Sequence, residues 1–147
     1  MLEIRDEGAV RVLTLDRPEV LNAFNGALFD ALTEGLLAAR ADDSVAVIVI
    51  TGRGRAFTAG ADLTEMGREV ARPEHGFDGM VDVLLDYTKP VICAVNGTAV
   101  GVGGTILGLV DVVFMAEAAK VRCPFAALGI NPEAGSSLTF PAMMGPQ

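Results

Sequence analysis

The chain has 147 residues, 51% of them hydrophobic, and its 19 acidic and 11 basic side chains give a formal net charge of −8. This composition is typical of one folded domain and argues against a disordered chain. The negative charge disfavours nucleic acid and anionic membrane surfaces as partners, because both require a basic face. Two cysteines, Cys93 and Cys123, are too few for a disulfide framework, and the N-terminus shows no signal peptide, so we expect a reducing, cytoplasmic location.

The first third of the chain predicts a hairpin, a helix and a buried strand. Apolar residues alternate over 10–15 and follow a short extended segment at 2–5, which indicates two antiparallel strands. Asn25 is a good N-cap for the helix that follows. Residues 45–50 form a continuous apolar run, which predicts a strand buried on both faces. The apolar side of the helix is formed by residues at helical spacing, namely Leu28, Leu32, Leu36 and Ala39.

The middle of the chain predicts a loop, a second helix and a second buried strand. Residues 57–63 are a small-residue loop that leads into a short helix, and residues 67–76 form an exposed loop. Lys89 and Pro90 end the second helix, and residues 91–95 form the next buried strand. The apolar stripe of the second helix consists of Phe77, Met80, Val81, Leu84 and Leu85.

Residues 91–110 contain no charge, but they match a strand, a glycine-rich turn and a buried helix at 105–109 better than a membrane span. Further strands are expected at 112–115 and 121–123, before a loop and an apolar helix within 128–147. Alternating strands and helices indicate a single α/β domain with mostly parallel pairing. The last helix has no partner for its apolar side chains, Phe140, Met143 and Met144, so we expect another subunit or further chain to cover them.

Two small-residue loops, at 59–62 and 101–104, each follow a strand and precede a helix. Such loops present free backbone N–H groups that can bind an anion or a developing oxyanion. The alternative is that small side chains only allow a tight turn. The second loop is not a dinucleotide fingerprint, because its spacing would require glycine where Ile106 stands.

Glu133 differs from the other acidic residues because it lies in an uncharged segment, 129–137, among apolar neighbours. Burial there would raise its pKa, as a general base or acid near neutral pH requires. The alternative is a carboxylate that stabilises the start of the following helix. The only histidine, His75, lies in a charged loop, and we expect no metal site.

Four segments, at residues 12–18, 21–24, 51–63 and 89–97, form a set of motifs that occur in order along the chain. With these motifs the sequence resembles the enoyl-CoA hydratase/isomerase (crotonase) superfamily along its whole length. The resemblance implies a spiral of ββα units, with an acyl-CoA thioester as substrate and an oxyanion hole for its carbonyl oxygen.

The resemblance also implies which residues form the site. The backbone N–H groups of Ala59 and Val102 would be the oxyanion donors. The two catalytic glutamates of hydratases would fall at Thr105 and Phe125, so the chain is not a standard hydratase. The segment around Glu133 instead resembles the Δ3,Δ2-enoyl-CoA isomerase branch, where one glutamate is the base. The CoA and thioester would be bound by Ala59, Gly60, Ala61, Asp62 and Leu63.

Coenzyme A is then part of the substrate, and no metal or redox cofactor is implied. Arg53 and Arg55 are candidates for contact with the CoA phosphates. Family members are longer, so residues 1–147 are expected to be a core domain without the C-terminal helices that build a homotrimer or a dimer of trimers. The alternatives are a non-catalytic acyl-CoA-binding protein, or another reaction of this family that uses Asp62 or Glu65.

Overall fold

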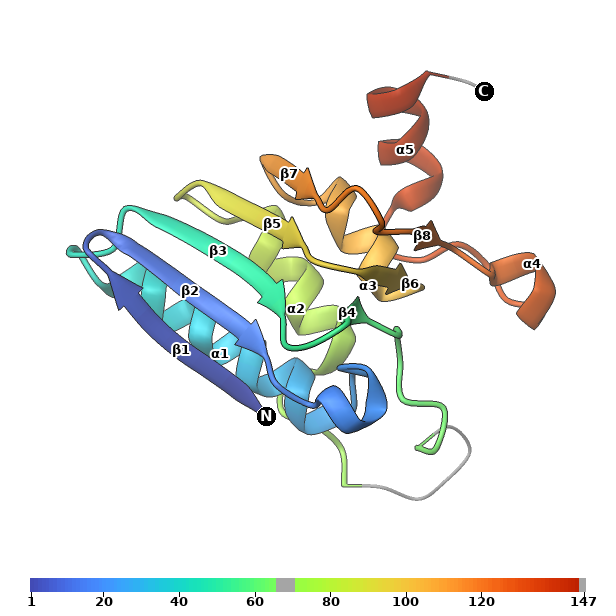
Figure 1. Cartoon of the computed structure of the whole chain (residues 1–147), viewed down its shortest axis with the longest axis horizontal. Helices are drawn as coiled ribbons and strands as arrows, with labels where there is room; N and C mark the ends of the chain where they lie inside the picture. The colour runs from blue at the N-terminus through green and yellow to red at the C-terminus, as the bar shows by residue number, and fades with distance from the viewer. Residues whose placement is uncertain (66–70, 146–147) are drawn as a thin grey trace.

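The computed structural model describes residues 1–65 and 71–145, whose strands form two sheets (Figure 1). The larger sheet has the order β1-β2-β3-β5-β7, and the smaller has the order β4-β6-β8. β1 and β2 pair antiparallel as the predicted hairpin, and the other pairs are parallel. The strands are β1 (Leu2–Glu7), β2 (Val10–Leu15), β3 (Val47–Gly52), β4 (Ala56–Thr58), β5 (Val91–Val95), β6 (Thr98–Val100), β7 (Val112–Met115) and β8 (Val121–Arg122).

From β3 onward, successive strands alternate between the two sheets, and a helix follows each pair of strands. The units are β3-β4-α2, β5-β6-α3 and β7-β8-α4. This order confirms the predicted α/β spiral of ββα units. The helices are α1 (Gly26–Ala41), α2 (Gly76–Leu85), α3 (Val102–Thr105), α4 (Phe125–Leu128) and α5 (Ser136–Met144), with 3-10 turns η1 (Pro18–Val20) and η2 (Ile106–Gly108).

Helices α1 and α2 lie behind the larger sheet in Figure 1 and cover one of its faces. Asn25 caps α1 as predicted, because its side-chain oxygen accepts the Leu28 N–H at 3.0 Å. The predicted apolar side of α1 is fully buried in the core. Cys93 of β5 lies in the same core, where burial raises the pKa of its thiol to about 12.

The prediction that the central strands are buried on both faces is wrong. In β3, Ile48 and Ile50 are fully buried, whereas Val47 and Val49 are half-buried, and β5 alternates in the same way. The reason is that the helices cover one face of this sheet, so that only alternate residues enter the core.

Helix boundaries differ from the prediction around the glycine-rich segment. The expected loop contains β6, and the expected helix at 105–109 begins earlier, at Val102, and continues as η2. Leu85, predicted on the buried stripe of α2, is 64% exposed because the helix ends there. No helix occurs within 59–65, and the remaining part of the predicted short helix lies outside the described residues.

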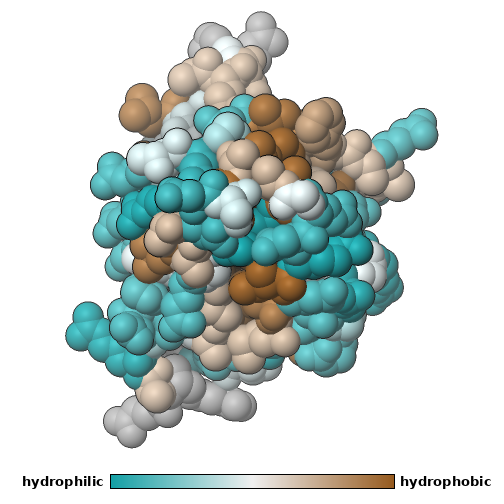
Figure 2. All heavy atoms as spheres, turned by 90° about the vertical axis from the view of Figure 1, so that its left-hand side faces the viewer, coloured by the Kyte–Doolittle hydropathy of each residue, from teal (hydrophilic) through white to brown (hydrophobic). Residues whose placement is uncertain are grey.

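Exposed apolar side chains include several on the edge strand β7 and on the helix α5. Phe114 of β7 is 64% exposed, and Met143 and Met144 of α5 are also exposed, as predicted for the last helix. Figure 2 shows another side of the molecule, where hydrophilic residues predominate and hydrophobic ones gather in separate patches. Among the described residues, no helix is long and apolar enough to cross a membrane.

Asn22 joins the loops that connect the two sheets. It is fully buried, and its Nδ2 donates to the backbone oxygens of Arg53 and Ala56 at 2.9 Å and of Phe57 at 3.2 Å. Its Oδ1 accepts the N–H of Arg17 at 2.9 Å. One side chain therefore fixes β4 and the turn before it against the segment before α1, and this contact helps to position the loop that follows β4.

Candidate active site

Two loops lie side by side where β4 and β6 end, because these strands are parallel neighbours in the smaller sheet. The loop after β4 passes very close to the loop after β6. Gly60 has φ +93°, and a Cβ at this position would lie 2.8 Å from the Val100 oxygen. Glycine is therefore required at position 60, both for this backbone conformation and for the close approach of the two loops.

The backbone hydrogen bonds of these loops engage some N–H groups and leave others free, among them those of Ala61 and Val102. The Ala59 N–H donates to the Leu21 oxygen at 2.9 Å, and the Gly60 N–H donates to the Thr58 hydroxyl at 3.1 Å. Within the described residues, the N–H groups of Ala61 and Val102 have no acceptor. The prediction that Ala59 supplies an oxyanion donor is therefore corrected, because its N–H is already engaged.

The pairing around Phe24 explains why the Ala61 N–H is free. Phe24 and Ala61 form a parallel bridge in which the Phe24 N–H donates to the Gly60 oxygen and the Asp62 N–H donates to the Phe24 oxygen. Neighbouring N–H groups of an extended chain point in opposite directions, so the Ala61 N–H points away from Phe24. Val102 is the first residue of α3, where an N–H has no partner within the helix.

Glu133 faces these loops from the segment between α4 and α5. Its Oε1 lies 4.0 Å from the position that a Cβ on Gly101 would occupy. The side chain is half-buried, and burial raises its pKa, while the Thr105 hydroxyl lowers the pKa in part. Ala134 and Gly135 follow with φ values of +49° and +64°, so the backbone turns sharply just after Glu133.

A cavity of about 280 Å³ lies between the two loops and Glu133. Four of the five residues predicted to bind the CoA and thioester line it, together with Val102 and Glu133, whereas Asp62 does not. Among the described residues that line it, Glu133 is the only one with a charged side chain. The others are mainly apolar: Val100, Gly101, Pro124, Phe125, Leu128 and Ile130.

The other two candidate carboxylates have structural partners. Asp62 accepts hydrogen bonds from the Thr64 hydroxyl at 2.7 Å and from Arg17 Nη1 at 3.1 Å. Its pKa is lowered, first by the Thr64 hydroxyl and also by Arg17. Glu65 accepts the Gly26 N–H at 3.0 Å and so caps the start of α1. Both carboxylates hold the loop in place, and neither faces the cavity as Glu133 does.

The two arginines predicted to meet phosphates differ in their surroundings. Arg53 forms ion pairs with Glu3 and with Asp16, the latter at 2.7 Å. Arg55 is exposed. Of these two arginines, Arg55 is the one whose guanidinium has no carboxylate partner among the described residues.

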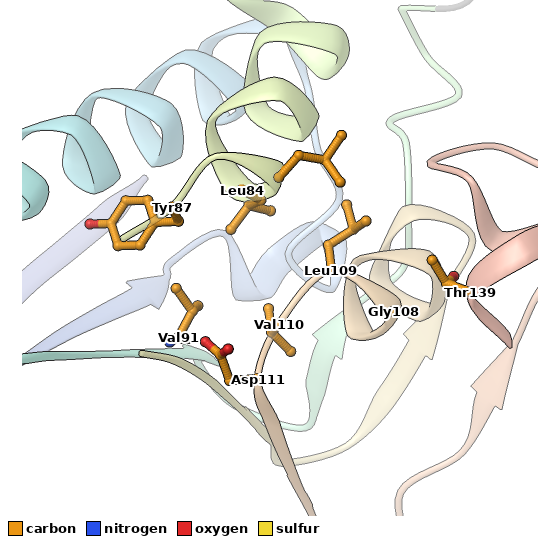
Figure 3. Close-up of a pocket in the computed structure, with 9 residues that line it drawn as sticks. Leu84, Tyr87, Val91, Gly108, Leu109, Val110, Asp111 and Thr139 are labelled. Atoms are coloured by element: carbon orange, nitrogen blue, oxygen red, sulfur yellow. Dashed lines mark hydrogen bonds between the residues drawn. The ribbon is translucent and has the colours of Figure 1, made fainter. Parts of the chain in front are cut away.

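A second cavity of about 280 Å³ lies between α2 and the η2 turn, away from Glu133 (Figure 3). Its polar groups are largely engaged inside the protein. The Asp111 carboxylate accepts the Val91 N–H at 2.8 Å, and the Tyr87 hydroxyl donates to the Leu36 oxygen at 2.6 Å. Among the described residues of this cavity, we find no carboxylate that faces free backbone N–H groups, as Glu133 does in the first cavity.

One group of side chains has the spacing of metal ligands. Ligand atoms of Glu34, Glu74 and His75 lie within 4.8 Å of one another on the surface. The backbone at His75 is held by Asp30, whose carboxylate accepts the His75 backbone N–H at 2.8 Å. The group lies outside the cavity of Glu133, and nothing beyond its spacing points to a metal.

Comparison with known protein families shows to which family the chain belongs. Residues 5–147 match the family model described as enoyl-CoA hydratase/isomerase. The chain belongs to the enoyl-CoA hydratase/isomerase family. The cavity, with its two free N–H groups and its carboxylate, is therefore the candidate active site of an enzyme of this family.

Proteins named as isomerases and proteins named as hydratases both resemble the chain. It is 37% identical to enoyl-CoA delta isomerase 2 of Rattus norvegicus, over 97% of this chain and 38% of the rat protein. It is 43% identical to 2,3-dehydroadipyl-CoA hydratase of Escherichia coli, over 87% of this chain and 51% of that protein. The crystal structure of an enoyl-CoA hydratase from Mycobacterium marinum superimposes with a TM-score of 0.92 at 48% identity, covering 98% of this chain and 69% of that one. The chain thus spans about half or less of the two sequence relatives.

Proposed function

We propose that the chain carries the active site of an enoyl-CoA isomerase, which moves the double bond of a 3-enoyl-CoA to the trans-2 position. The observation that supports this most is a single carboxylate, Glu133, facing two loops with free N–H groups across an otherwise apolar cavity. Isomerisation requires one proton carrier, and the cavity offers one. The sequence relatives are longer than this chain, so the proposed activity and substrate are those of the whole protein.

In the proposed reaction, Glu133 takes a proton from C2 of the thioester, and the electrons of that C–H bond form a dienolate. The negative charge on the thioester oxygen is stabilised by the N–H groups of Ala61 and Val102, in place of the pair that includes Ala59. Glu133 then returns the proton to C4, and the double bond forms between C2 and C3. Its raised pKa suits both steps, because the same group must accept and donate a proton.

Hydration is disfavoured by the residues at the two positions where the resemblance implies hydratase glutamates. Thr105 is fully buried, and Phe125, which is nearly buried, lines the cavity. Neither side chain can activate a water molecule as a carboxylate does. A water molecule beside Phe125 would also lack a strong hydrogen-bond acceptor on that side.

The proposed reaction relocates a proton and a double bond without net oxidation or reduction, so we propose no redox cofactor and no metal, and coenzyme A enters as part of the substrate. We also propose that the whole protein forms a homotrimer or a dimer of trimers. Sedimentation of the protein should then give a species of at least three chains, and a stable monomer would overturn this proposal.

Turnover of a 3-enoyl-CoA, followed through the absorbance of the conjugated product, tests the function. Glu133→Gln keeps the shape of the side chain but cannot accept the proton, so turnover should fall by about 10²–10⁴-fold. Glu117→Gln is the matched control, because Glu117 is exposed and lies outside the cavity. It should retain full turnover.

Activity that survives Glu133→Gln would move the base to another residue. A protein that binds acyl-CoA with equal affinity before and after the substitution, but turns nothing over, would be the non-catalytic binder.

A further inference from the structure

Thr58 is a buried polar side chain beside the oxyanion loops that the proposed mechanism leaves unused. It is the last residue of β4 and is fully buried. It lies outside the lining of the Glu133 cavity, so its role is not contact with a substrate in that cavity. A buried hydroxyl must find its partners within the protein, and these partners show which segments it holds.

The hydroxyl of Thr58 joins two segments that are far apart in the sequence. It donates to the Asn22 oxygen at 2.7 Å and accepts the Gly60 N–H at 3.1 Å, and both distances are normal for hydrogen bonds. The hydroxyl has one proton, which goes to the Asn22 oxygen, so a lone pair is left for the Gly60 N–H. The hydroxyl therefore ties the loop after β4 to the segment before α1.

These hydrogen bonds hold the peptide group that carries the Ala61 N–H. Thr58 engages the N–H of Gly60, and the Phe24 N–H donates to the oxygen of Gly60 at 2.7 Å. The Gly60 carbonyl and the Ala61 N–H belong to one planar peptide group, so a Gly60 that is fixed at both ends fixes the direction of the Ala61 N–H. Gly60 needs this support, because a glycine at φ +93° has no side chain that restricts its backbone.

The methyl group of Thr58 packs against the loop that carries the other proposed donor. A Cβ at Gly103 would clash with this methyl group and would lie 3.3 Å from the Thr58 backbone oxygen. The backbone of α3 at Gly103 therefore rests directly on Thr58. Val102, which supplies the other N–H, is the preceding residue and begins this helix. One side chain thus contacts both of the loops that supply the donors.

Thr33, another fully buried threonine, forms its hydrogen bond within its own helix, where its hydroxyl donates to the Phe29 oxygen at 2.8 Å. Thr58 instead connects separate segments that meet at the site. We infer that Thr58 is a positioning residue that sets the distance between the Ala61 and Val102 N–H groups. Its hydroxyl holds the first group, and its methyl group holds the second. This inference rests on the proposed function, which uses the two N–H groups as oxyanion donors.

The test compares Thr58→Val, Thr58→Ser and Thr33→Val in the turnover of a 3-enoyl-CoA. Thr58→Val removes the hydroxyl and keeps the methyl group, and Thr58→Ser does the reverse. Displaced donors lose most in the transition state, where the charge on the thioester oxygen is largest, so kcat should fall by about 10- to 100-fold in Thr58→Val with little change in KM. Thr58→Ser should restore part of kcat, and Thr33→Val should retain it. A loss confined to KM, or an equal loss of kcat in Thr33→Val, would overturn the inference.

Amide NMR signals of the free protein separate this inference from the proposed function, because they require no turnover. In Thr58→Val, the Gly60 amide should exchange its hydrogen faster and the Ala61 signal should move, while the Val102 signal stays in place. In Thr58→Ser, the Gly60 amide should stay protected and the Val102 signal should move. These changes support the positioning role even in an inactive protein. Unchanged Gly60 and Ala61 amides in Thr58→Val, or an unchanged Val102 amide in Thr58→Ser, overturn it. Thr58→Ala lacks both groups and should change all three amides, which keeps the test open if the valine variant does not fold.

Discussion

Two polar clusters on neighbouring loops differ in how their hydrogen-bonding groups are used. Around Asn22, Arg17 and Asp62, the donors and acceptors meet one another, and one buried amide contacts three backbone oxygens. Around Glu133, two N–H groups and a carboxylate face a cavity instead. Satisfied groups of this kind stabilise a fold, whereas free groups that converge are available to a substrate. The first cluster therefore builds the loops that the second one uses.

The largest expected effect concerns the free N–H of Val102. Val102→Pro removes this N–H, and proline is tolerated at the first position of a helix. The loss of one oxyanion donor should lower turnover by about 10²–10³-fold. Val102→Ala is the control, because it shortens the side chain and keeps the N–H, and steady-state turnover of a 3-enoyl-CoA compares the two. Equal activity in both variants would remove Val102 from the oxyanion hole.

The Asn22 cluster should respond in stability. Asn22→Ala leaves buried backbone oxygens without a donor, so the free energy of unfolding should fall by about 3 kcal/mol. Urea unfolding measures this change. Asn131→Ala, at an exposed asparagine, should have almost no effect. A loss of similar size in both variants would show that the cluster has no special role.

The pH dependence of stability should have opposite signs in the two clusters. The pKa of Asp62 is lowered, chiefly by the Thr64 hydroxyl, so its contribution is present above the ordinary aspartate pKa and is lost as pH falls through the folded value. The pKa of Glu133 is raised by burial, so its contribution is present below the ordinary glutamate pKa and is lost as pH rises through the folded value.

At neutral pH, Asp62→Asn should therefore lower the urea midpoint, and Glu133→Gln should raise it modestly. Both differences should shrink in acid, where the wild-type carboxyl groups are protonated. Changes of the same sign in the two variants would contradict the contrast between a structural and a catalytic carboxylate.

The smallest effect concerns the turn after Glu133. Ala134 has φ +49°, a conformation that costs a residue with a Cβ about 1 kcal/mol. Ala134→Gly should raise the free energy of unfolding by less than about 1 kcal/mol, since glycine also loses more entropy on folding. Gly135→Ala should change stability in the opposite direction, because Gly135 has φ +64° and open space around it. Thermal unfolding of the pair measures the sign, and a stabilising Gly135→Ala would contradict it.

Local patterns in the sequence predicted most of the elements, including the hairpin, the Asn25 cap, the apolar side of α1 and the strand β7. They failed where neighbours in space decide the outcome. Burial of β3 on both faces would have required helices on both faces of the larger sheet. The described helices cover one face, so only alternate residues of β3 are buried. The short strand β6 is defined by its parallel partners β4 and β8 rather than by its own three residues.

The candidate site was likewise predicted in part from the sequence and missed in part. Glu133 was singled out from its uncharged surroundings, and it lines the same cavity as Val102. The free N–H of Ala61 was missed, because the Leu21 and Phe24 contacts that engage the neighbouring groups come from a distant segment. Had the bridge between Phe24 and Ala61 been known, the alternation of N–H directions along an extended chain would have indicated that the Ala61 N–H is free.

The most direct test of the account is product analysis by liquid chromatography, with absorbance detection of the conjugated thioester and mass spectrometry, for two substrates, a 3-enoyl-CoA and a trans-2-enoyl-CoA. The account predicts that the 3-enoyl-CoA is converted to the conjugated 2-enoyl-CoA of unchanged mass, that Glu133→Gln abolishes this conversion, and that the trans-2-enoyl-CoA gains no water. A product heavier by one water molecule, formed from the trans-2-enoyl-CoA at a rate comparable to the isomerisation, would contradict a site with a single proton carrier.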